Sequence, residues 1–260
     1  MLLFAAILQK EIIRHMSKKK EWFGEWFDSP YYHILYKNRD NTEAHTFIDN
    51  LCIYLGFSPQ DKILDLACGK GRHAIYLNHK GFDVTGIDLS AENIKYASQF
   101  SNSKLGFYIH DMREVFAYDQ FDYVLNMFTS FGYFDSTDEH KSAIAAAAKA
   151  LKTGGKLIVD FLNTYKVVNN LVPAEVKEVD GILFNITKEI SNNGYIIKKI
   201  SFEHQGQLYH YQEKVKAIRR IEFLEFFEQA GLSCKQLFGS YDLDSYEKEM
   251  SDRMIFIVEK

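Results

Sequence analysis

Between Lys62 and Asn163 the chain alternates short apolar runs with segments of helical pattern, and this alternation constrains the fold more than any other feature. Strands that alternate with helices form βαβ units, in which the paired strands run parallel. The pattern predicts strands at 63–67, 84–88, 105–110, 123–127 and 156–161. Helices are predicted at 40–56, 72–78, 91–100 and 139–151. Thr153-Gly154-Gly155 is interpreted as the glycine-rich cap of helix 139–151.

After Asn163 the pattern changes to antiparallel strands. Residues 175–219 carry three long β-type runs, joined at Asn192-Asn193-Gly194 and at Gln205-Gly206-Gln207, which are typical of hairpin turns. One face of this insertion is predicted to be apolar because apolar residues recur with period two at Ile182, Phe184, Ile186 and Ile190. A helix at 221–230 and two strands, at about 233–239 and at 254–258, would complete the main sheet.

The predicted fold is therefore α/β, a doubly wound, seven-stranded, mostly parallel sheet with an antiparallel β insertion. We predict an N-terminal extension and aromatic cap at 1–39 and a cofactor-binding core at 40–166. The β insertion would occupy 167–220, and the C-terminal part of the core sheet 221–260.

Composition narrows the partners and the compartment. A chain of 260 residues with 47% apolar and 25% charged residues is an ordinary folded protein, which excludes disorder and fibrous structure. The three cysteines, Cys52, Cys68 and Cys234, are odd in number and far apart, so neither a disulfide framework nor a zinc cluster is indicated and a reducing cytoplasm is expected. A net charge of −4 supplies no basic field for nucleic acid, which favours a small-molecule substrate.

The N-terminus indicates neither a secretory signal nor a membrane anchor. Its apolar run from Leu2 to Leu8 is short, whereas a membrane span needs about 20 apolar residues. Because Met16 is followed by Ser17 and three lysines, we interpret residues 1–15 as an upstream extension of a chain that natively starts at Met16.

The segment Ile63–His73 is the most informative about ligand binding. A strand leads through Gly69 and Gly71 into a helix, so that ligand atoms can approach bare backbone and free N–H groups at the helix start. This spacing also satisfies a dinucleotide-binding pattern, which alone is weakly specific. Asp65 favours a different ligand, since a carboxylate near the end of a buried strand needs a partner and an aminoacyl ligand carries an ammonium.

Two further acidic residues follow the next predicted strands. Asp88 lies 19 residues beyond Gly69, close to the spacing of about 20 at which a carboxylate accepts hydrogen bonds from both hydroxyls of a ribose. Its alternative role is a solvated strand end or a helix cap. Asp111 follows the third strand and could accept from an adenine amino group, with Met112 against the ring; an ordinary turn aspartate is the alternative.

The chain resembles the class I S-adenosylmethionine-dependent methyltransferases. The resemblance rests on Asp65-Leu-Ala-Cys-Gly-Lys-Gly-Arg-His, Gly86-Ile-Asp88-Leu-Ser, Asp111-Met-Arg, and Phe121-Asp-Tyr-Val-Leu-Asn126 followed by Thr129-Ser-Phe-Gly-Tyr-Phe134. It covers most of residues 40–164 and is closest to small-molecule-type members with an antiparallel insertion after the fifth strand. It implies a Rossmann-like methyltransferase fold, S-adenosyl-L-methionine as cofactor and S-adenosyl-L-homocysteine as product.

The resemblance also implies which residues meet the cofactor. The glycine loop would hold the methionine part, the acid ending the second strand the ribose, and the acid after the third strand the adenine. The residues carried over are Tyr32, Asp65, Ala67, Gly69, Gly71, His73, Asp88, Leu89, Asp111, Met112 and Asn126. Ala67 stands where many members have glycine, and its methyl group is expected to be tolerated.

Ligands of open α/β sheets bind at the carboxyl ends of the strands, so the segment after Asn126 is predicted to line the place where methyl donor and acceptor meet. Its candidate substrate contacts are Phe128, Ser130, Phe131 and Tyr133, with core packing as the alternative. An N-terminal aromatic segment, with Tyr31, Tyr32, Tyr36 and Arg39, resembles the one by which such enzymes cover the cofactor; plain packing is again the alternative.

Catalysis by such an enzyme mainly requires positioning of a nucleophile and exclusion of water. A general base is needed only if the nucleophile arrives protonated. The candidate general bases are His73, His110, Tyr133, His204 and His210, and a structural role is the alternative for each of them. No grouping has metal-ligand spacing, so no metal is predicted. The insertion could cover the acceptor, form a dimer interface or simply pack, with the aromatics Phe184, Tyr195, Phe202, Tyr209 and Tyr211.

The predicted function is a cytoplasmic S-adenosylmethionine-dependent methyltransferase that acts on an unidentified small molecule, without nucleic acid or membrane as partner. The alternatives are an NAD(P)-dependent oxidoreductase, which shares the glycine loop and the ribose acid, and a cofactor-binding regulator without turnover.

Overall fold

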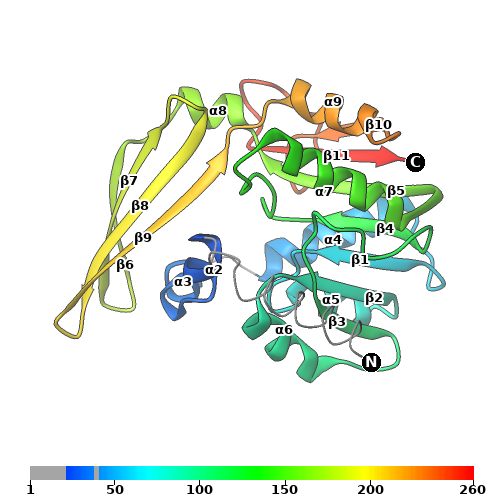
Figure 1. The fold of residues 1–260 in the computed structure, drawn as a ribbon, viewed down its shortest axis with the longest axis horizontal. Helices are drawn as coiled ribbons and strands as arrows, with labels where there is room; N and C mark the ends of the chain where they lie inside the picture. The colour runs from blue at the N-terminus through cyan, green and yellow to red at the C-terminus, as the bar shows by residue number, and fades with distance from the viewer. Residues whose placement is uncertain (1–21, 38–40) are drawn as a thin grey trace, which may run out of the picture.

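The computed structural model of this chain describes residues 22–37 and 41–260, and their strands form one seven-stranded and one four-stranded sheet (Figure 1). The predicted extension at 1–15 and the predicted cap residue Arg39 lie outside the described residues. Within the described part of the chain, no helix is both long enough and apolar enough to cross a membrane.

The larger sheet has the strand order β10-β11-β5-β4-β1-β2-β3. Its strands are β1 (Lys62–Leu66), β2 (Asp83–Asp88), β3 (Leu105–Ile109), β4 (Phe121–Asn126), β5 (Leu151–Leu162), β10 (Ser233–Phe238) and β11 (Arg253–Glu259). β11 pairs antiparallel with both of its neighbours, and the other pairs are parallel, which confirms the predicted mostly parallel sheet. The strand order reverses between β1 and β4, where doubly wound sheets open a crevice for ligands.

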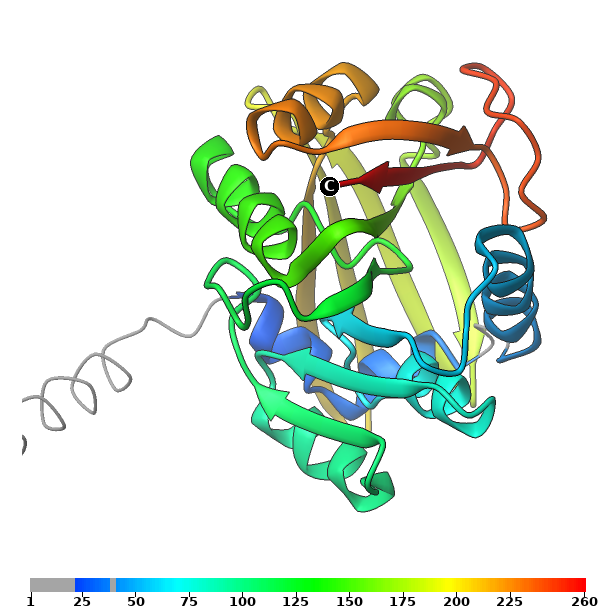
Figure 2. The same ribbon diagram turned by 90° about the vertical axis from the view of Figure 1, so that its right-hand side faces the viewer.

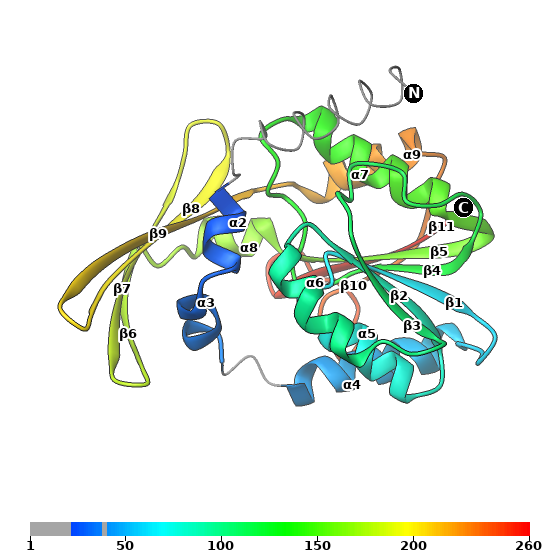
Figure 3. The same cartoon turned by 60° about the horizontal axis from the view of Figure 1, so that its bottom comes forward.

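Helices cover both faces of this sheet. They are α4 (Asn41–Leu55), α5 (Arg72–His79), α6 (Ala91–Ala97), α7 (Thr137–Ala150) and α9 (Arg220–Gln229), and a 3₁₀ turn η1 (Ser98–Phe100) follows α6. One core packs α4, α5 and α6 against one face of the sheet, and the other core packs α7 and α9 against the opposite face (Figures 2 and 3). Both faces are therefore buried, as the continuous apolar strands require.

Local capping explains where several helices begin. The Ser136 hydroxyl accepts from the Glu139 amide while the Glu139 carboxylate accepts from the Ser136 amide, which forms a capping box at the start of α7. Ser90 caps α6 through the amide of Asn93. At α5 the N-cap is Gly71, which has no side chain, so a partner for the first amides of that helix must come from elsewhere in the chain.

The smaller sheet is an antiparallel meander of four strands, which corrects the predicted three. Its strands are β6 (Ala174–Val179), β7 (Ile182–Ile190), β8 (Tyr195–His204) and β9 (Gln207–Lys216). The missed turn is Asp180-Gly181, with φ of 52° and 75°. Asp-Gly is a strong signal for a two-residue hairpin turn, because both positions need positive φ. Ile182, Phe184 and Ile186 are buried as predicted, whereas Ile190 is 39% exposed, so the covered part of this face ends before it.

The glycine pair after α7 is not a helix cap, contrary to the prediction. The chain leaves α7 at Leu151 in extended conformation, and Thr153-Gly154-Gly155 lies within β5. Leu151 already pairs with Phe121, and the register between β4 and β5 shifts before the next pair. The two glycines therefore lie in an irregular, bulge-like part of β5.

Three short helices had no counterpart in the predictions: α2 (Trp22–Phe27), α3 (Pro30–Leu35) and α8 (Thr164–Asn169). Figure 1 shows α2 and α3 between the two sheets. Trp26 and Leu35 are buried in a core with apolar residues of the smaller sheet, among them Phe184 and Phe202. The aromatic N-terminal segment thus supplies the inner cover of that sheet. The domain boundaries stay a prediction.

Replacing Phe184 with alanine is expected to destabilise the protein by about 3–5 kcal/mol, the usual cost of emptying a buried aromatic site. The Phe184 side chain is 0% exposed, and its ring lies 4.7 Å from that of Phe202. The matched control is Leu183→Ala on the opposite face, where the side chain is 55% exposed and little change is expected. Urea unfolding followed by circular dichroism measures both, and equal losses would contradict this assignment of the faces.

Candidate active site

The turn from β1 into α5 exposes bare backbone. Gly69 has φ of 55°, and a Cβ built on it would meet no atom within 4 Å, so open space faces this residue at the cavity wall. Gly71, with φ of 80°, has a different role, because a Cβ there would lie 2.7 Å from the Phe107 ring. Gly71 therefore permits close packing of α5 against β3 and lies behind the wall rather than on it.

Ala67 occupies the first position of this turn with φ of 55°, in the left-handed region. That conformation costs an L-residue about 1–2 kcal/mol, a cost that glycine does not have. The methyl group is accommodated at the cavity wall, but at the expense of backbone strain.

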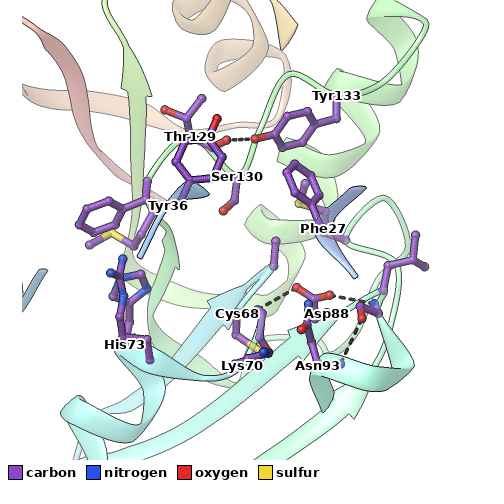
Figure 4. Close-up of a pocket in the computed structure, with 18 of the residues that line it drawn as sticks. Phe27, Tyr36, Cys68, Lys70, His73, Asp88, Asn93, Thr129, Ser130 and Tyr133 are labelled. Atoms are coloured by element: carbon purple, nitrogen blue, oxygen red, sulfur yellow. Dashed lines mark hydrogen bonds between the residues drawn. The ribbon is translucent and has the colours of Figure 1, made fainter. Parts of the chain in front are cut away.

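Asp88 ties the glycine turn to the end of β2 (Figure 4). Its Oδ2 accepts from the Gly69 amide at 2.8 Å, and its Oδ1 accepts from the Ser90 amide at 2.8 Å. Asp88 and Leu89 line the cavity. Burial raises the pKa of Asp88, while the backbone amides that it accepts from act in the opposite direction. The carboxylate thus has a fixed orientation and lone pairs left over for a ligand.

Asp65 lies behind the glycine turn. It is 1% exposed and not on the cavity wall, and it accepts a hydrogen bond from the Ala74 amide in the first turn of α5. Its Oδ2 is buried without a hydrogen-bond partner. Burial, with the nearby Asp88 charge second, raises the pKa of Asp65 to about 7. In this position Asp65 holds the start of α5, and its predicted role toward an ammonium stays a prediction.

The segment after β3 carries an ion pair that the sequence did not indicate. Arg113 donates from Nη2 to Asp111 Oδ2 at 2.7 Å and from Nη1 to Glu139 Oε1 at 2.6 Å, and its guanidinium lies 4.9 Å from the Phe134 ring. Asp111 and Met112 both line the cavity, and their contact with an adenine stays a prediction. Asp111 is therefore held rigidly by an arginine before any ligand arrives.

The residues after β4 divide between the cavity and the core. Phe128, Ser130 and Tyr133 line the cavity, and Tyr133 donates to the Thr129 carbonyl at 2.6 Å (Figure 4). Phe131 is only 2% exposed and packs in the core against Phe134 and Phe223, so its assignment as a substrate contact was wrong.

Asn126, the last residue of β4, is also buried and lies behind the wall. Its Nδ2 donates to the Leu66 carbonyl at 3.4 Å, which links the ends of β4 and β1. Its Oδ1 has no hydrogen-bond partner, and the same is true of His110 Nδ1 just after β3. Unpartnered polar atoms thus occur near the carboxyl ends of β1, β3 and β4, in Asp65, His110 and Asn126.

A buried ion pair, missed in the sequence, holds the loop after β4. Asp160 in β5 is 0% exposed, and its Oδ1 accepts from Arg253 Nη2 of β11 at 2.7 Å. Asp160 Oδ2 accepts from the Phe128 amide at 2.6 Å and from the Tyr241 hydroxyl at 3.2 Å. Arg253 also donates to Thr129 Oγ1 at 2.8 Å. These bonds hold Phe128 and Thr129 in the left-handed region, with φ of 55° and 61°.

The sequence did not indicate which residue pairs with Asp160, because Arg253 lies 93 residues away. The one available signal was Asp160 itself, a charged residue within a run that otherwise reads as fully buried, which implies a partner.

His73 lies at the start of α5 and lines the cavity. Its ring stacks on Phe128 at 4.9 Å, and Arg72 Nη2 lies 3.1 Å from its Nε2. Burial, followed by the Arg72 charge, lowers the pKa of His73 to about 3. A ring that stays neutral at physiological pH and is flanked by a guanidinium can pack against a ligand but is a poor proton acceptor.

The N-terminal helices bring aromatic rings to the same cavity. Phe27, Tyr32 and Tyr36 line it, in agreement with the predicted aromatic cap. Tyr31 instead faces the smaller sheet, where its ring lies 4.6 Å from Phe202 and its hydroxyl 2.9 Å from His204 Nδ1.

The smaller sheet reaches the cavity through Glu213 and Val215 of β9. None of the five aromatics predicted to shape the pocket lines it: Phe184, Tyr195, Phe202, Tyr209 and Tyr211. Most of them pack around α2 and α3, and the Tyr195 hydroxyl donates to the Phe134 carbonyl at 2.9 Å. The possible helpers His204 and His210 also lie off the cavity wall, whereas His110 lies on it.

The cavity has a volume of about 2560 Å³ and lies at the carboxyl ends of β1 to β4, closed on the far side by α2, α3 and β9. Its wall fits the cofactor that the resemblance implies. On the wall, Gly69 offers open backbone and Asp88 offers a fixed carboxylate. Behind the wall, the buried Asp65 Oδ2 lacks a donor. Residues 22–37 and 41–260 contain no group of three His, Cys, Asp or Glu side chains that could hold a metal ion.

Arg253→Met is expected to destabilise the protein by about 3–5 kcal/mol, because Asp160 would remain as a buried carboxylate without its cation. The double variant Asp160→Asn, Arg253→Met leaves no buried charge and should lose clearly less. Urea unfolding of the single and double variants measures this, and equal losses would contradict the ion-pair explanation.

Asp65 is expected to make the ligand-free protein less stable as pH rises. Its folded pKa of about 7 exceeds the ordinary 3.8, so between these values the folded state binds more protons than the unfolded state and stability falls toward high pH. Asp65→Asn keeps an acceptor for the Ala74 amide and removes the charge. The stability of this variant relative to the native chain should therefore increase from about pH 4 to about pH 7, measured by urea unfolding. A difference independent of pH would refute it.

Comparison with known proteins agrees with the geometry of this site. Residues 63–155 match a family model described as a methyltransferase domain. The Bacillus subtilis protein YqeM, whose name describes it as a methyltransferase, is 28% identical over 85% of this chain and 94% of its own length. A sugar N,N-dimethyltransferase of Streptomyces venezuelae is 29% identical over 58% of this chain and 64% of its own.

Among solved structures, an S-adenosylmethionine-dependent methyltransferase from Clostridium acetobutylicum superposes with a TM-score of 0.75. The superposition covers 88% of this chain and 95% of that one, at 21% identity, and shows a shared fold. The family model, the relatives and the fold agree with the glycine turn and with the acid at the end of β2, Asp88. Together these findings support a class I S-adenosylmethionine-dependent methyltransferase.

Proposed function

We propose that this S-adenosylmethionine-dependent methyltransferase acts on a small-molecule acceptor, held between the two sheets. The observation that carries the proposal is the cavity of about 2560 Å³. Sites for a single small ligand usually measure about 300–1,000 Å³, so this cavity has room for a cofactor and an acceptor together. Two relatives are named for small acceptors, the sugar N,N-dimethyltransferase and the glycine N-methyltransferase of Rattus norvegicus, which is 30% identical over 39% of this chain.

In this proposal the cofactor lies along the carboxyl ends of β1, β2 and β3. Asp88 accepts from the ribose hydroxyls with the lone pairs that its two amide bonds leave open. Gly69 approaches the methionine part, and Asp111 with Met112 lies beside the adenine. S-adenosylmethionine supplies an activated methyl group when bound, so the protein has chiefly to orient the acceptor and exclude water.

The remaining wall then belongs to the acceptor. Phe128, Ser130 and Tyr133 line it from the core side, and Tyr32 covers it from α3. The nicotinamide-dependent alternative is set aside because the family model and the relatives are methyltransferases. We further propose a cytoplasmic location, which rests on the three separated cysteines, and no nucleic-acid partner, which rests on the net charge of −4.

Asp88→Asn is expected to weaken binding of S-adenosylhomocysteine by about 10- to 100-fold, because a hydrogen bond to a charged group contributes about 1.5–3 kcal/mol. The matched control is Asp83→Asn at the opposite end of the same strand, which does not line the cavity. Isothermal titration calorimetry measures both, and an unchanged affinity of Asp88→Asn would remove Asp88 as the ribose ligand.

The acceptor class is tested with S-adenosylmethionine that carries a labelled methyl group. The full chain is incubated with a small-metabolite extract and, separately, with RNA and protein from the same cells, with Asp88→Asn as the control for background. Label is expected in the small-metabolite fraction. Label found only in RNA or protein would overturn the small-molecule proposal.

A further inference from the structure

Glu213 is the charged residue that the smaller sheet contributes to the cavity wall. Its Oε1 accepts from Trp26 Nε1 at 2.7 Å and from the Tyr36 hydroxyl at 2.6 Å. Its Oε2 accepts no hydrogen bond from the described residues but forms an ion pair with Lys198, whose Nζ lies 3.7 Å away. Lys198 Nζ also donates to the Tyr36 hydroxyl and lies 4.7 Å from the centre of the Tyr36 ring. Two donors therefore fix the carboxylate in place through one oxygen, while the other oxygen keeps its hydrogen-bonding capacity.

A row of aromatic rings begins beside this carboxylate. The centre of the Tyr36 ring lies 5.0 Å from that of Tyr32. The ring of Phe27 continues the row, with its centre 5.1 Å from that of Tyr32 and 5.3 Å from that of Tyr133. All four line the cavity, and Figure 4 shows Phe27, Tyr36 and Tyr133 around the same hollow. Faces of aromatic rings attract cations through their quadrupoles, most strongly where water is excluded.

The charged residues of the cavity wall also favour a cationic ligand. Eleven of the residues that line the cavity are aspartate or glutamate, and five are lysine or arginine. Among the five, Arg253, Arg113 and Lys37 are paired with carboxylates of the described residues. At least five of the eleven acidic residues are paired with cations, among them Glu213 with Lys198, and the acids still outnumber the bases. A cleft lined mainly by one sign of charge concentrates ligands of the opposite sign. Carboxylate and phenolate acceptors are disfavoured by such a wall, and cationic ones are favoured.

We propose that the methyl acceptor is an organic amine and that Glu213 and the adjoining aromatic row bind its positive charge; this inference rests on the proposed function. The bound ammonium first gives one proton to water, and the neutral nitrogen then forms the N–CH3 bond as the S–CH3 bond breaks. The bonding electrons of S–CH3 stay on sulfur, which becomes a neutral thioether, and the nitrogen acquires the positive charge. A fixed carboxylate beside that nitrogen stabilises the charge it acquires.

Three probes of similar size and different charge test this inference on the full chain: ethanolamine, ethylene glycol and glycolate. Their binding is followed by ligand-observed NMR, with and without S-adenosylhomocysteine. Ethanolamine should bind about tenfold more tightly than ethylene glycol, and glycolate most weakly, since a charge-assisted contact contributes about 1.4 kcal/mol or more.

Variants assign the preference to Glu213. Glu213→Gln is nearly isosteric and keeps an oxygen for Trp26 and Tyr36, and it should remove most of the tenfold preference. The control Glu203→Gln removes the same charge from an exposed position of the smaller sheet, away from the cavity, and should change nothing. Lys198→Met removes the cation nearest Glu213 Oε2 and should strengthen ethanolamine binding.

The inference is overturned if ethanolamine does not bind, if it binds no better than ethylene glycol, or if Glu213→Gln retains the preference. Failure of S-adenosylhomocysteine to bind would count against the proposed function instead, because the titrations without it measure the charge preference separately. In the labelled-methyl experiment, the product should be retained on a cation exchanger, and label confined to neutral or anionic products would also overturn the inference.

Discussion

The hydrogen bonds that Asp88 accepts from Gly69 and Ser90 hold the centre of this site together. They join the turn after β1 to the turn after β2, so that the glycine backbone and the carboxylate face one cavity. Parallel pairing of β1 with both β2 and β4 makes this possible, because it places the carboxyl ends of these strands at one edge of the sheet. Behind the turn, Asp65 accepts a hydrogen bond from the Ala74 amide in the first turn of α5.

The loop after β4 depends on a second interaction, the buried pair of Asp160 and Arg253. These residues belong to β5 and β11, which pair antiparallel, and their side chains hold the strained backbone at Phe128 and Thr129. Strain of this kind persists only where the surrounding structure over-determines it, and here β5, β11 and Tyr241 all contribute. Strands β5 and β11 therefore fix the conformation of the loop that follows β4.

The cavity itself is a product of two sheets and the helices between them. The inner face of the smaller sheet is covered by α2 and α3, whose other residues line the cavity. The insertion thus acts on the site chiefly by carrying the N-terminal aromatics, and directly through Glu213 and Val215. Large aromatic side chains serve both purposes, since Trp26 is buried in that core while its Nε1 fixes the Glu213 carboxylate.

The sequence alone predicted the alternation of strands and helices, the glycine turn and the acids at 65, 88 and 111. Each of these follows from local periodicity or from fixed spacing along one βα unit. The sequence by itself determined the sheet and one edge of the site for that reason. Only the tertiary structure decided that Phe131 enters the core, that Asp160 pairs with Arg253, and that Glu213 faces the cavity. These outcomes depend on which face of an element meets which distant neighbour, and that is set by packing between segments that no local pattern relates.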